Sequence, residues 1–186
     1  AYKLKAYRLP LGTPQARGKA MVNLLPLSDG ETITTVLPLP ENEEGWGDLF
    51  AVFATTSGNI RRNRLSDFTD VRANGKIAMK FEGENAGDRL IRVRVFEEED
   101  NVFLATRDGK CIRFPVSDVR VFSGRTSIGV RGIQLEGDDQ VISMAGLKHV
   151  KAEIEDRDIY LSAVNASRRL AGGDYTDRAE DKAHDE

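Results

Sequence analysis

Two stretches of sequence, 51 residues apart, decide the fold: residues 53–62 read FATTSGNIRR and residues 104–113 read LATRDGKCIR. The same spacing continues to Leu65–Phe68 and Val116–Val119, which read LSDF and VSDV. A repeat of this length matches a propeller blade and is too long for most helical solenoid units. Because one repeat unit cannot bury its own apolar face, the sequence predicts an array of neighbouring units.

A second block of sequence returns three times. It reads ARGKAMV at residues 16–22, ANGKIAM at residues 73–79 and SIGVRGI at residues 127–133, with spacings of 57 and 54. The register derived for the basic positions aligns Lys5 with Arg61 and Ile112, Arg8 with Arg64, and Lys80 with Gln134. Charge recurs at these positions, so we expect a basic stripe along one rim of the array. The alternative is scattered surface charge that blunts sheet edges.

Short apolar runs separated by glycine turns predict that residues 1–146 consist of β-strands. Ser57-Gly58 and Asp108-Gly109 have the form of two-residue hairpin turns, in which glycine supplies the positive φ that a tight turn requires. Segments 33–36 and 140–144 occupy matching positions in the first and third copies. Each copy is therefore expected to supply about four strands, which is one blade.

The predicted architecture is an all-β, propeller-like array of about 2.5 blades, followed by a segment of different character. Blade boundaries are expected near residues 45–50 and 96–101. Apolar residues then recur at near-helical spacing, and Gly172-Gly173 would stop such a helix, so residues 147–173 are predicted to be a helical insertion. Residues 174–186 hold no aliphatic side chain larger than Ala, which predicts an acidic, disordered tail.

Charge is distributed unevenly along the chain. Residues 1–131 hold 20 Lys and Arg against 17 Asp and Glu, a net of +3. Residues 132–186 hold 7 against 13, a net of −6, which together give the overall −3. A mildly basic array thus precedes an acidic tail, and a globally acidic molecule of this kind can still present one basic surface.

Cys111 is the only cysteine, so no internal disulfide can form and a reducing compartment fits. Because it lies beside Ile112 in an apolar strand, we expect it to be a small core residue rather than a reactive thiol. The chain has neither a signal peptide nor an apolar run long enough to cross a bilayer, so we expect a cytoplasmic protein without a membrane span. The first residues open within a predicted strand and lack Met, which indicates a piece of a longer protein.

No pattern in the sequence indicates a catalyst or a metal site. Gly18-Lys19 and Gly75-Lys76 have the form of phosphate-contacting turns, with a turn before an inner strand as the alternative. Neither lies in the GxxxxGK[ST] frame of a nucleotide-binding P-loop. Ser66-Asp67 and Ser117-Asp118 recur in register, as turns do and active sites do not. We therefore expect no catalytic residue, no metal and no cofactor in this chain.

Several segments resemble, in order and spacing, the C-terminal domain of the bacterial DNA gyrase A subunit. They are residues 15–27 (QARGKAMVNLLPL), 54–68 (ATTSGNIRRNRLSDF), 75–80 (GKIAMK) and 129–133 (GVRGI). The resemblance implies a β-pinwheel, a six-bladed disc whose blades exchange strands and whose basic rim wraps double-stranded DNA. It also implies a parent type II topoisomerase that introduces negative supercoils with ATP and Mg, used through other domains. Its partners would be a second A subunit together with the B subunit.

The chain departs from that family in three ways. It carries fewer than six blades, it lacks a gyrase box of the Gln-Arg-Arg-Gly-Gly-Lys-Gly type, and none of its tyrosines matches the DNA-cleavage motif. On the basic stripe and the resemblance together, the predicted DNA-binding residues are Lys5, Arg8, Arg17, Lys19, Arg61, Arg62, Arg64, Lys76, Lys80, Arg113, Arg125 and Arg131. Three alternatives remain open: the C-terminal domain of the topoisomerase IV A subunit, a propeller for protein–protein contact, and a propeller enzyme.

Overall fold

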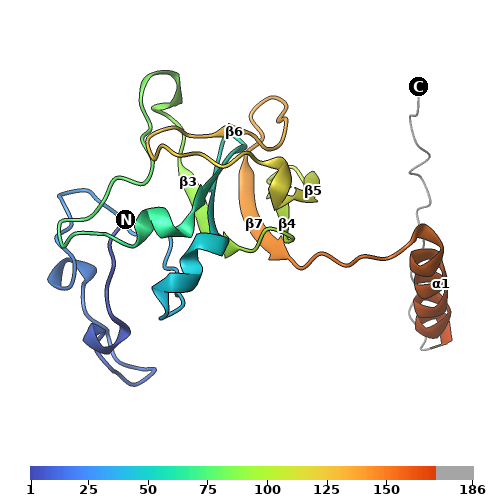
Figure 1. Ribbon diagram of the computed structural model, residues 1–186, viewed down its shortest axis with the longest axis horizontal. Coiled ribbons are helices and arrows are strands. Elements are labelled where there is room, and N and C mark those ends of the chain that lie inside the picture. Colours follow the sequence, from blue (N-terminus) through green and yellow to red (C-terminus); the bar gives the residue numbers. More distant parts are fainter. Residues whose placement is uncertain (171–186) are drawn as a thin grey trace. The chain divides into compact units, whose positions relative to one another are not determined.

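The computed structural model describes residues 1–170, which divide into two compact units, residues 1–149 and the chain from Val150 onward. The first unit is all-β (Figure 1). Its strands are β1 (Phe50–Thr55), β2 (Asn59–Arg64), β3 (Leu90–Phe96), β4 (Asn101–Thr106), β5 (Cys111–Pro115), β6 (Val130–Arg131) and β7 (Val141–Leu147). Its short 3-10 turns are η1 (Ala6–Arg8), η2 (Met21–Asn23), η3 (Glu43–Asp48), η4 (Leu65–Phe68), η5 (Gly83–Asn85) and η6 (Val116–Asp118).

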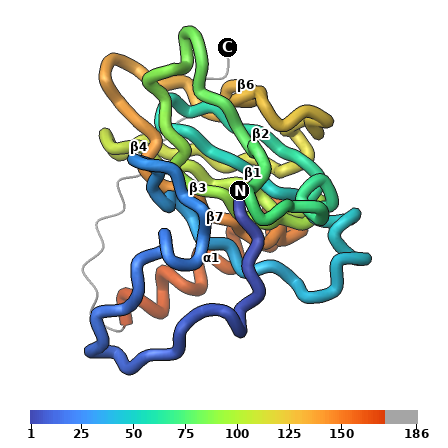
Figure 2. The backbone as a smooth tube through the Cα atoms, turned by 90° about the vertical axis from the view of Figure 1, so that its left-hand side faces the viewer, coloured from blue at the N-terminus to red at the C-terminus, as the bar shows by residue number. Residues whose placement is uncertain are grey.

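The first sheet has the strand order β3-β1-β2-β6, and all its pairs are antiparallel (Figure 2). β1 and β2 form the predicted hairpin, and Gly58 in its turn has a φ of 81°. β6 comes from the third copy of the repeat and pairs with β2 through Asn59↔Arg131 and Ile60↔Val130. The second copy therefore completes its sheet with a strand from the copy that follows, which is the strand exchange that the resemblance implied.

The second sheet repeats this plan with one strand fewer, in the order β5-β4-β7. Gly109 in the β4–β5 turn has a φ of 86°. The register shifts between Ala105 and Thr106 opposite β7, and between Ala54 and Thr55 opposite β3, which are equivalent positions of the two copies. Four strands were expected here, but the described residues contain no later copy to donate a partner to β5.

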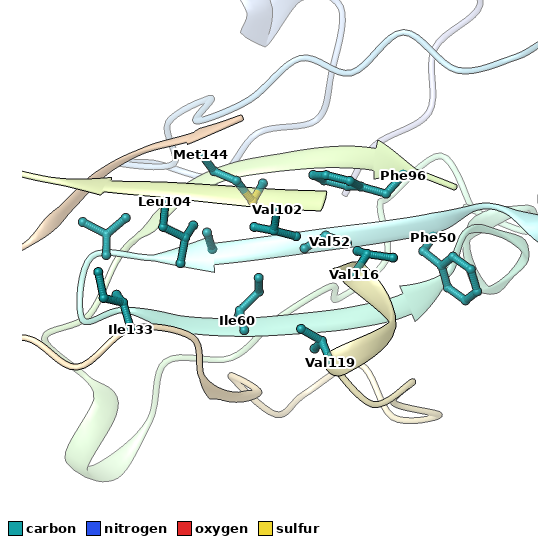
Figure 3. Packing of buried hydrophobic residues seen from close by; sticks show 12 residues of the cluster. Phe50, Val52, Ile60, Phe96, Val102, Leu104, Val116, Val119, Ile133 and Met144 are labelled. Atoms are coloured by element: carbon teal, nitrogen blue, oxygen red, sulfur yellow. The ribbon is translucent and has the colours of Figure 1, made fainter. Parts of the chain in front are cut away.

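The main hydrophobic core lies between the two sheets (Figure 3). Phe50, Val52 and Ile60 of the first sheet meet Val102, Leu104 and Met144 of the second, and all six are buried. The other face of the first sheet carries a smaller cluster around Phe53, Leu65 and Trp46. Because both of its faces are covered, β1 is buried at every residue, which explains its unbroken apolar sequence FAVFAT.

No strand precedes β1 in the described chain, so the prediction of strands from residue 1 is wrong (Figure 1). β3 pairs with β1 and β7 pairs with β4, so the corresponding segment 33–36 needs an equivalent partner to become a strand. That partner position falls before residue 1. The segment runs instead as loops with the turns η1, η2 and η3, and it contributes Leu39 and Trp46 to the smaller cluster.

The first copy also aligns differently from the sequence-derived register. Ala1 and Lys76 exchange backbone hydrogen bonds of 2.8 and 2.9 Å, in the place that Ile60 and Val130 occupy one repeat later. Ala1 therefore corresponds to Ile60, which is three positions away from the register that aligned Lys5 with Arg61. Tyr2 stands at the position of Arg61, Lys5 at that of Arg64, and Arg8 at that of Asp67.

Cys111 is exposed, which corrects its prediction as a core residue. The corresponding Ile60 in β2 is fully buried because β6 and Gly132 pack beside it. β5 has no such neighbour among the described residues, so apolar sequence alone does not bury Cys111. Burial of a strand in a repeat protein depends on the next copy as much as on the strand itself.

A helix is present in the second unit, within the predicted range. α1 spans Ile154–Leu170, with Glu155 and Asp156 in its first turn and Arg168 and Arg169 in its last. This charge order complements the helix dipole. Gly172-Gly173 and the predicted acidic tail, residues 174–186, lie outside the described residues.

One carboxylate at each hairpin, not singled out from the sequence, holds the turn in place. Asp88 accepts hydrogen bonds from the Thr56 hydroxyl (2.7 Å), the Ser57 N–H (2.9 Å) and the Ser57 hydroxyl. Asp139, the equivalent residue of the next copy, accepts from the Asp108 N–H at 3.0 Å. Partial burial would raise the pKa of Asp88, but the hydrogen bonds from Ser57, Thr55 and Thr56 outweigh it and lower the pKa to about 2 from 3.8.

Replacement of Gly129 by Ala should strongly destabilise the first unit. Gly129 has a φ of 106°, and an added Cβ would lie 2.0 Å from the Ile60 carbonyl oxygen. The β2–β6 pairing would have to separate, so we expect a loss of about 3 kcal/mol in urea unfolding. Gly137→Ala is the matched control, because Gly137 also has a positive φ of 56° but meets no atom within 4 Å, and it should cost about 1 kcal/mol. Equal costs for the two variants would contradict the tight contact.

Asp88 should also make stability depend on pH below about 4. Because its folded pKa is depressed, its contribution is present above the unfolded value of 3.8 and disappears as pH falls towards 2. At pH 7 we expect Asp88→Asn to lose about 1 kcal/mol, after allowance for solvent screening of a partly exposed group. Urea unfolding at several pH values should show the wild type and variant converging near pH 2. A constant difference would show that the carboxylate charge is irrelevant.

Candidate nucleic-acid interface

Two consecutive copies of the returning block lie side by side at one edge of the first sheet. We call residues 75–80 and 125–131 the edge segments. Residues 75–80 pair with Ala1 through Lys76, and residues 125–131 include β6, which pairs with β2. The Lys80 N–H donates to the Thr126 carbonyl at 3.1 Å, which joins one edge segment to the other. Most of the predicted DNA-binding residues of the second and third copies lie on or under these segments.

Arg61 is the residue beneath both edge segments. Its guanidinium donates to the Arg125 carbonyl at 3.0 Å and to the carbonyls of Ser127 and Ala78. It also stacks over the Phe53 ring at 4.5 Å, and its exposed fraction is 0%. Burial lowers the pKa of Arg61 to about 10 from 12.5, so the group remains charged at neutral pH. The expectation that Arg61 contributes to an exposed basic stripe is therefore wrong.

The neighbouring residues of β2 also serve the fold. The Asn63 side chain donates to the carbonyls of Phe122 (2.7 Å) and Gly124 (3.0 Å), which lead into the second edge segment. Arg62 pairs with Glu98 at 3.1 Å and is 5% exposed. β2 therefore carries polar residues because the incoming segment offers backbone carbonyls, rather than because the strand faces solvent.

Strand alternation correctly placed Arg62 and Arg64 on one face and Arg61 on the other. The guanidinium groups of Arg62 and Arg64 lie over the same Phe50 ring, at 4.4 and 5.7 Å. The inference that this shared face is open to solvent fails for Arg62, because the second sheet covers it. Arg64 is exposed, and it donates to the Gly47 carbonyl at 2.8 Å.

The other candidates on the edge segments differ in how free their charges are. The Lys76 ammonium donates to the carbonyls of Asp67 and Asp70, at 2.9 and 3.0 Å. Lys80 is half-exposed and pairs with Glu82 at 3.1 Å. Arg125 is half-buried, and its Nε has no partner. Arg131, at the end of β6, is exposed.

The remaining candidates are fully accessible. They are Lys5, Arg8, Arg17, Lys19 and Arg113. Arg17 and Lys19 flank Gly18, whose φ of 71° matches the positive φ of Gly75 and Gly129 at the corresponding positions. An added Cβ on Gly18 would meet nothing within 4 Å, so this turn is open where the two later ones are packed. The charges on Arg17 and Lys19 are therefore available to a phosphate.

Repeat alignment did not select Arg120, which is exposed and stacks over the Phe122 ring at 4.2 Å. Its position in the second copy is occupied by Thr69, so no charge recurs there. The hydroxyls of Thr126 and Ser127 were missed because they have no charge to align. Proximity to the edge segments, which the sequence does not report, is the signal that identifies all three.

Comparison with known proteins places this geometry in a family. The family model described as "DNA gyrase C-terminal domain, beta-propeller" matches residues 1–40, 50–97 and 100–147. The chain belongs to this family. The three matched ranges correspond to the three copies of the repeat, including the first, which forms no strand here.

Curated relatives of this gyrase C-terminal family are closely similar. The DNA gyrase A subunit from Granulibacter bethesdensis is 52% identical over 94% of this chain, and that from Rickettsia bellii is 50% identical over 91%. The Escherichia coli protein is 42% identical over 77%. The chain spans only 18% of the length of the first two relatives and 16% of the third.

Solved structures share the fold at lower identity. The crystal structure of the C-terminal domain of DNA topoisomerase IV has a TM-score of 0.61 and 21% identity, covering 71% of this chain and 39% of that one. The structure of the DNA gyrase A C-terminal domain has a TM-score of 0.53 and 20% identity, covering 70% and 41%. These neighbours confirm the propeller-like fold. Within residues 1–170, no cluster of three or more His, Cys, Asp or Glu side chains could hold a metal ion.

Arg61 should be needed for folding, in contrast to exposed arginines of the same surface. Arg61→Gln would leave buried carbonyls of Ala78, Arg125 and Ser127 without donors, so we expect a loss of about 3 kcal/mol in urea unfolding. Arg131→Gln removes the same charge from an exposed position and should change stability by less than about 0.5 kcal/mol. Wild-type stability of Arg61→Gln would show that the buried contacts contribute nothing.

Proposed function

We propose that this chain is a DNA-binding and DNA-wrapping part of the DNA gyrase A subunit. The observation that carries the proposal is the 50% and 52% identity to proteins of that name over more than nine-tenths of the chain. The exposed charges of Arg17, Lys19 and Arg131, next to turns that recur in every copy, support it physically. Lys and Arg bind duplex DNA mainly through its phosphates.

Binding of this kind would be independent of base sequence. The available arginines and lysines of the first unit lie on turns and strand edges, and none belongs to an α-helix that could enter a major groove. Contacts to phosphates position a duplex without reading its bases, and wrapping must tolerate any sequence. The function we infer is therefore to bend DNA along a protein edge rather than to recognise a site.

The activity of the whole enzyme is part of the same proposal. The parent protein would be an ATP-dependent type II topoisomerase of the bacterial cytoplasm that introduces negative supercoils. It would act with a second A subunit and with the gyrase B protein. ATP and Mg would be used by other domains and by that B protein, and this chain would carry no catalytic residue. A topoisomerase IV origin is the nearest alternative, supported by the fold at 21% identity.

The test is the salt dependence of duplex binding by the full-length chain. A phosphate-binding surface predicts a linear fall of log affinity with log salt concentration, and similar affinities for duplexes of unrelated sequence. A propeller for protein contact predicts weak DNA binding with no such slope. Strong preference for one duplex would contradict a wrapping function.

Removal of two accessible charges should reduce the slope in proportion. The double variant Arg17→Ala/Lys19→Ala removes about two phosphate contacts, so the slope should fall by about 1.8, at roughly 0.9 per contact. The matched control is Arg107→Ala/Lys110→Ala, which removes the same net charge. Its side chains are already paired with Asp108 and Glu136, so the slope should stay close to wild type. Equal losses in both variants would show that only net charge matters.

A further inference from the structure

A shallow notch lies at the seam between the two edge segments. Its lining residues are Lys80, Glu82, Asn85, Thr126, Ser127 and Ile128. The first three follow the second copy of the returning block, and the last three belong to the third copy. Because the Lys80 N–H donates to the Thr126 carbonyl at 3.1 Å, the two walls are fixed relative to each other. The notch is therefore made by the contact between repeats and belongs to neither repeat alone.

The polar groups of the notch suit an anion. The Lys80 ammonium is half-exposed, and its carboxylate partner Glu82, at 3.1 Å, has 71% of its side chain exposed. The Ser127 hydroxyl oxygen accepts from the Gly129 N–H at 3.1 Å, which leaves its O–H free to donate. An ammonium and a hydroxyl donor on facing walls form the kind of site that holds a phosphate oxygen.

A buried positive charge under the notch lacks a counter-charge. The Arg61 guanidinium donates to the carbonyls of Ala78, Arg125 and Ser127, which are the backbone of the notch walls. No carboxylate within residues 1–170 forms an ion pair with Arg61. The Nε atoms of Arg61 and Arg125 are both buried without a partner. Buried charges in folded proteins are usually paired, so this uncompensated guanidinium favours an anion close by.

We propose that this notch is a phosphate-binding site and that its occupant is a backbone phosphate of duplex DNA. The proposal rests on the proposed function and adds a defined contact to it. Lys80 and the Ser127 hydroxyl donate to the phosphate oxygens, and Arg61 stabilises the anion through its field without touching it. Glu82 competes with the phosphate for Lys80, so DNA binding at the notch breaks the Lys80–Glu82 ion pair.

Only this seam carries the full set of charges within the described residues. In the observed register, Tyr2 and Ile112 occupy the position of Arg61, and neither can supply a buried charge. Gln134 occupies the position of Lys80 in the next copy. The notch therefore predicts one strong phosphate contact at a single place along the array, in place of the regularly repeated stripe expected from the sequence.

The first experiment removes the notch lysine. Lys80→Gln shortens the side chain only slightly and lies on the surface, so the fold should be preserved. The slope of log affinity against log salt should fall by about 0.9, which corresponds to one phosphate contact. Lys110→Gln is the matched control, because Lys110 is half-exposed and paired with Glu136 at 2.6 Å. Its slope should match wild type.

The second experiment releases the competitor. Glu82→Gln frees Lys80, so affinity at low salt should rise about threefold above that of Glu84→Gln, as expected for loss of one surface ion pair. Glu84 is exposed and lies close by in sequence, and its replacement makes the same change in net charge. A gain in Glu82→Gln that disappears when combined with Lys80→Gln would tie the effect to the notch.

A third measurement identifies the occupant. Addition of duplex DNA should shift the backbone amide NMR signals of Thr126 and Ser127 in wild type and much less in Lys80→Gln. If inorganic phosphate shifts these signals and DNA does not, the occupant we name is wrong. If wild type binds DNA with a clear salt slope while Lys80→Gln matches it, the notch proposal fails and the proposed function stands. If wild type binds no DNA, the proposed function itself fails.

Discussion

The guanidinium of Arg61 is the joint on which the first unit depends. Three backbone positions converge on it: residue 78 from one copy of the repeat, and residues 125 and 127 from the next. β2 cannot satisfy its own outer edge, and it obtains a partner only when β6 arrives from the following copy. Arg61, with Asn63 beside it, holds that incoming segment. Strand exchange therefore requires both a free strand edge and a polar anchor below it.

The sequence predicts those parts of the fold that each repeat encodes locally. The regular spacing of the copies, the hairpin turns at Gly58 and Gly109, and the family resemblance all followed from the sequence and are confirmed. Prediction failed where a residue depends on a neighbouring copy. Residues 33–36 have a strand sequence without a partner, and Cys111 has a core sequence without a cover.

The candidate site shows the same division in its charges. Alternation along β2 correctly assigned Arg62 and Arg64 to one face, because side-chain direction is a local property. It could not show that the second sheet covers Arg62 or that the edge segments cover Arg61, because those contacts join distant parts of the chain. Lys80 and Arg131 were selected for their charge, whereas the hydroxyl of Ser127 gains its proposed role only from what lies opposite.

The open edge of β5 has a consequence for the behaviour of the chain in solution. β5 corresponds to β2, yet no strand within residues 1–170 occupies the position that β6 fills on β2. Residues 16–22 correspond to β6 and have no strand to pair with. One end of the molecule thus offers the acceptor that the other end lacks, so two copies can meet head to tail through unlike surfaces. Such a contact does not close on itself, and the length of the resulting chains would be governed by protein concentration.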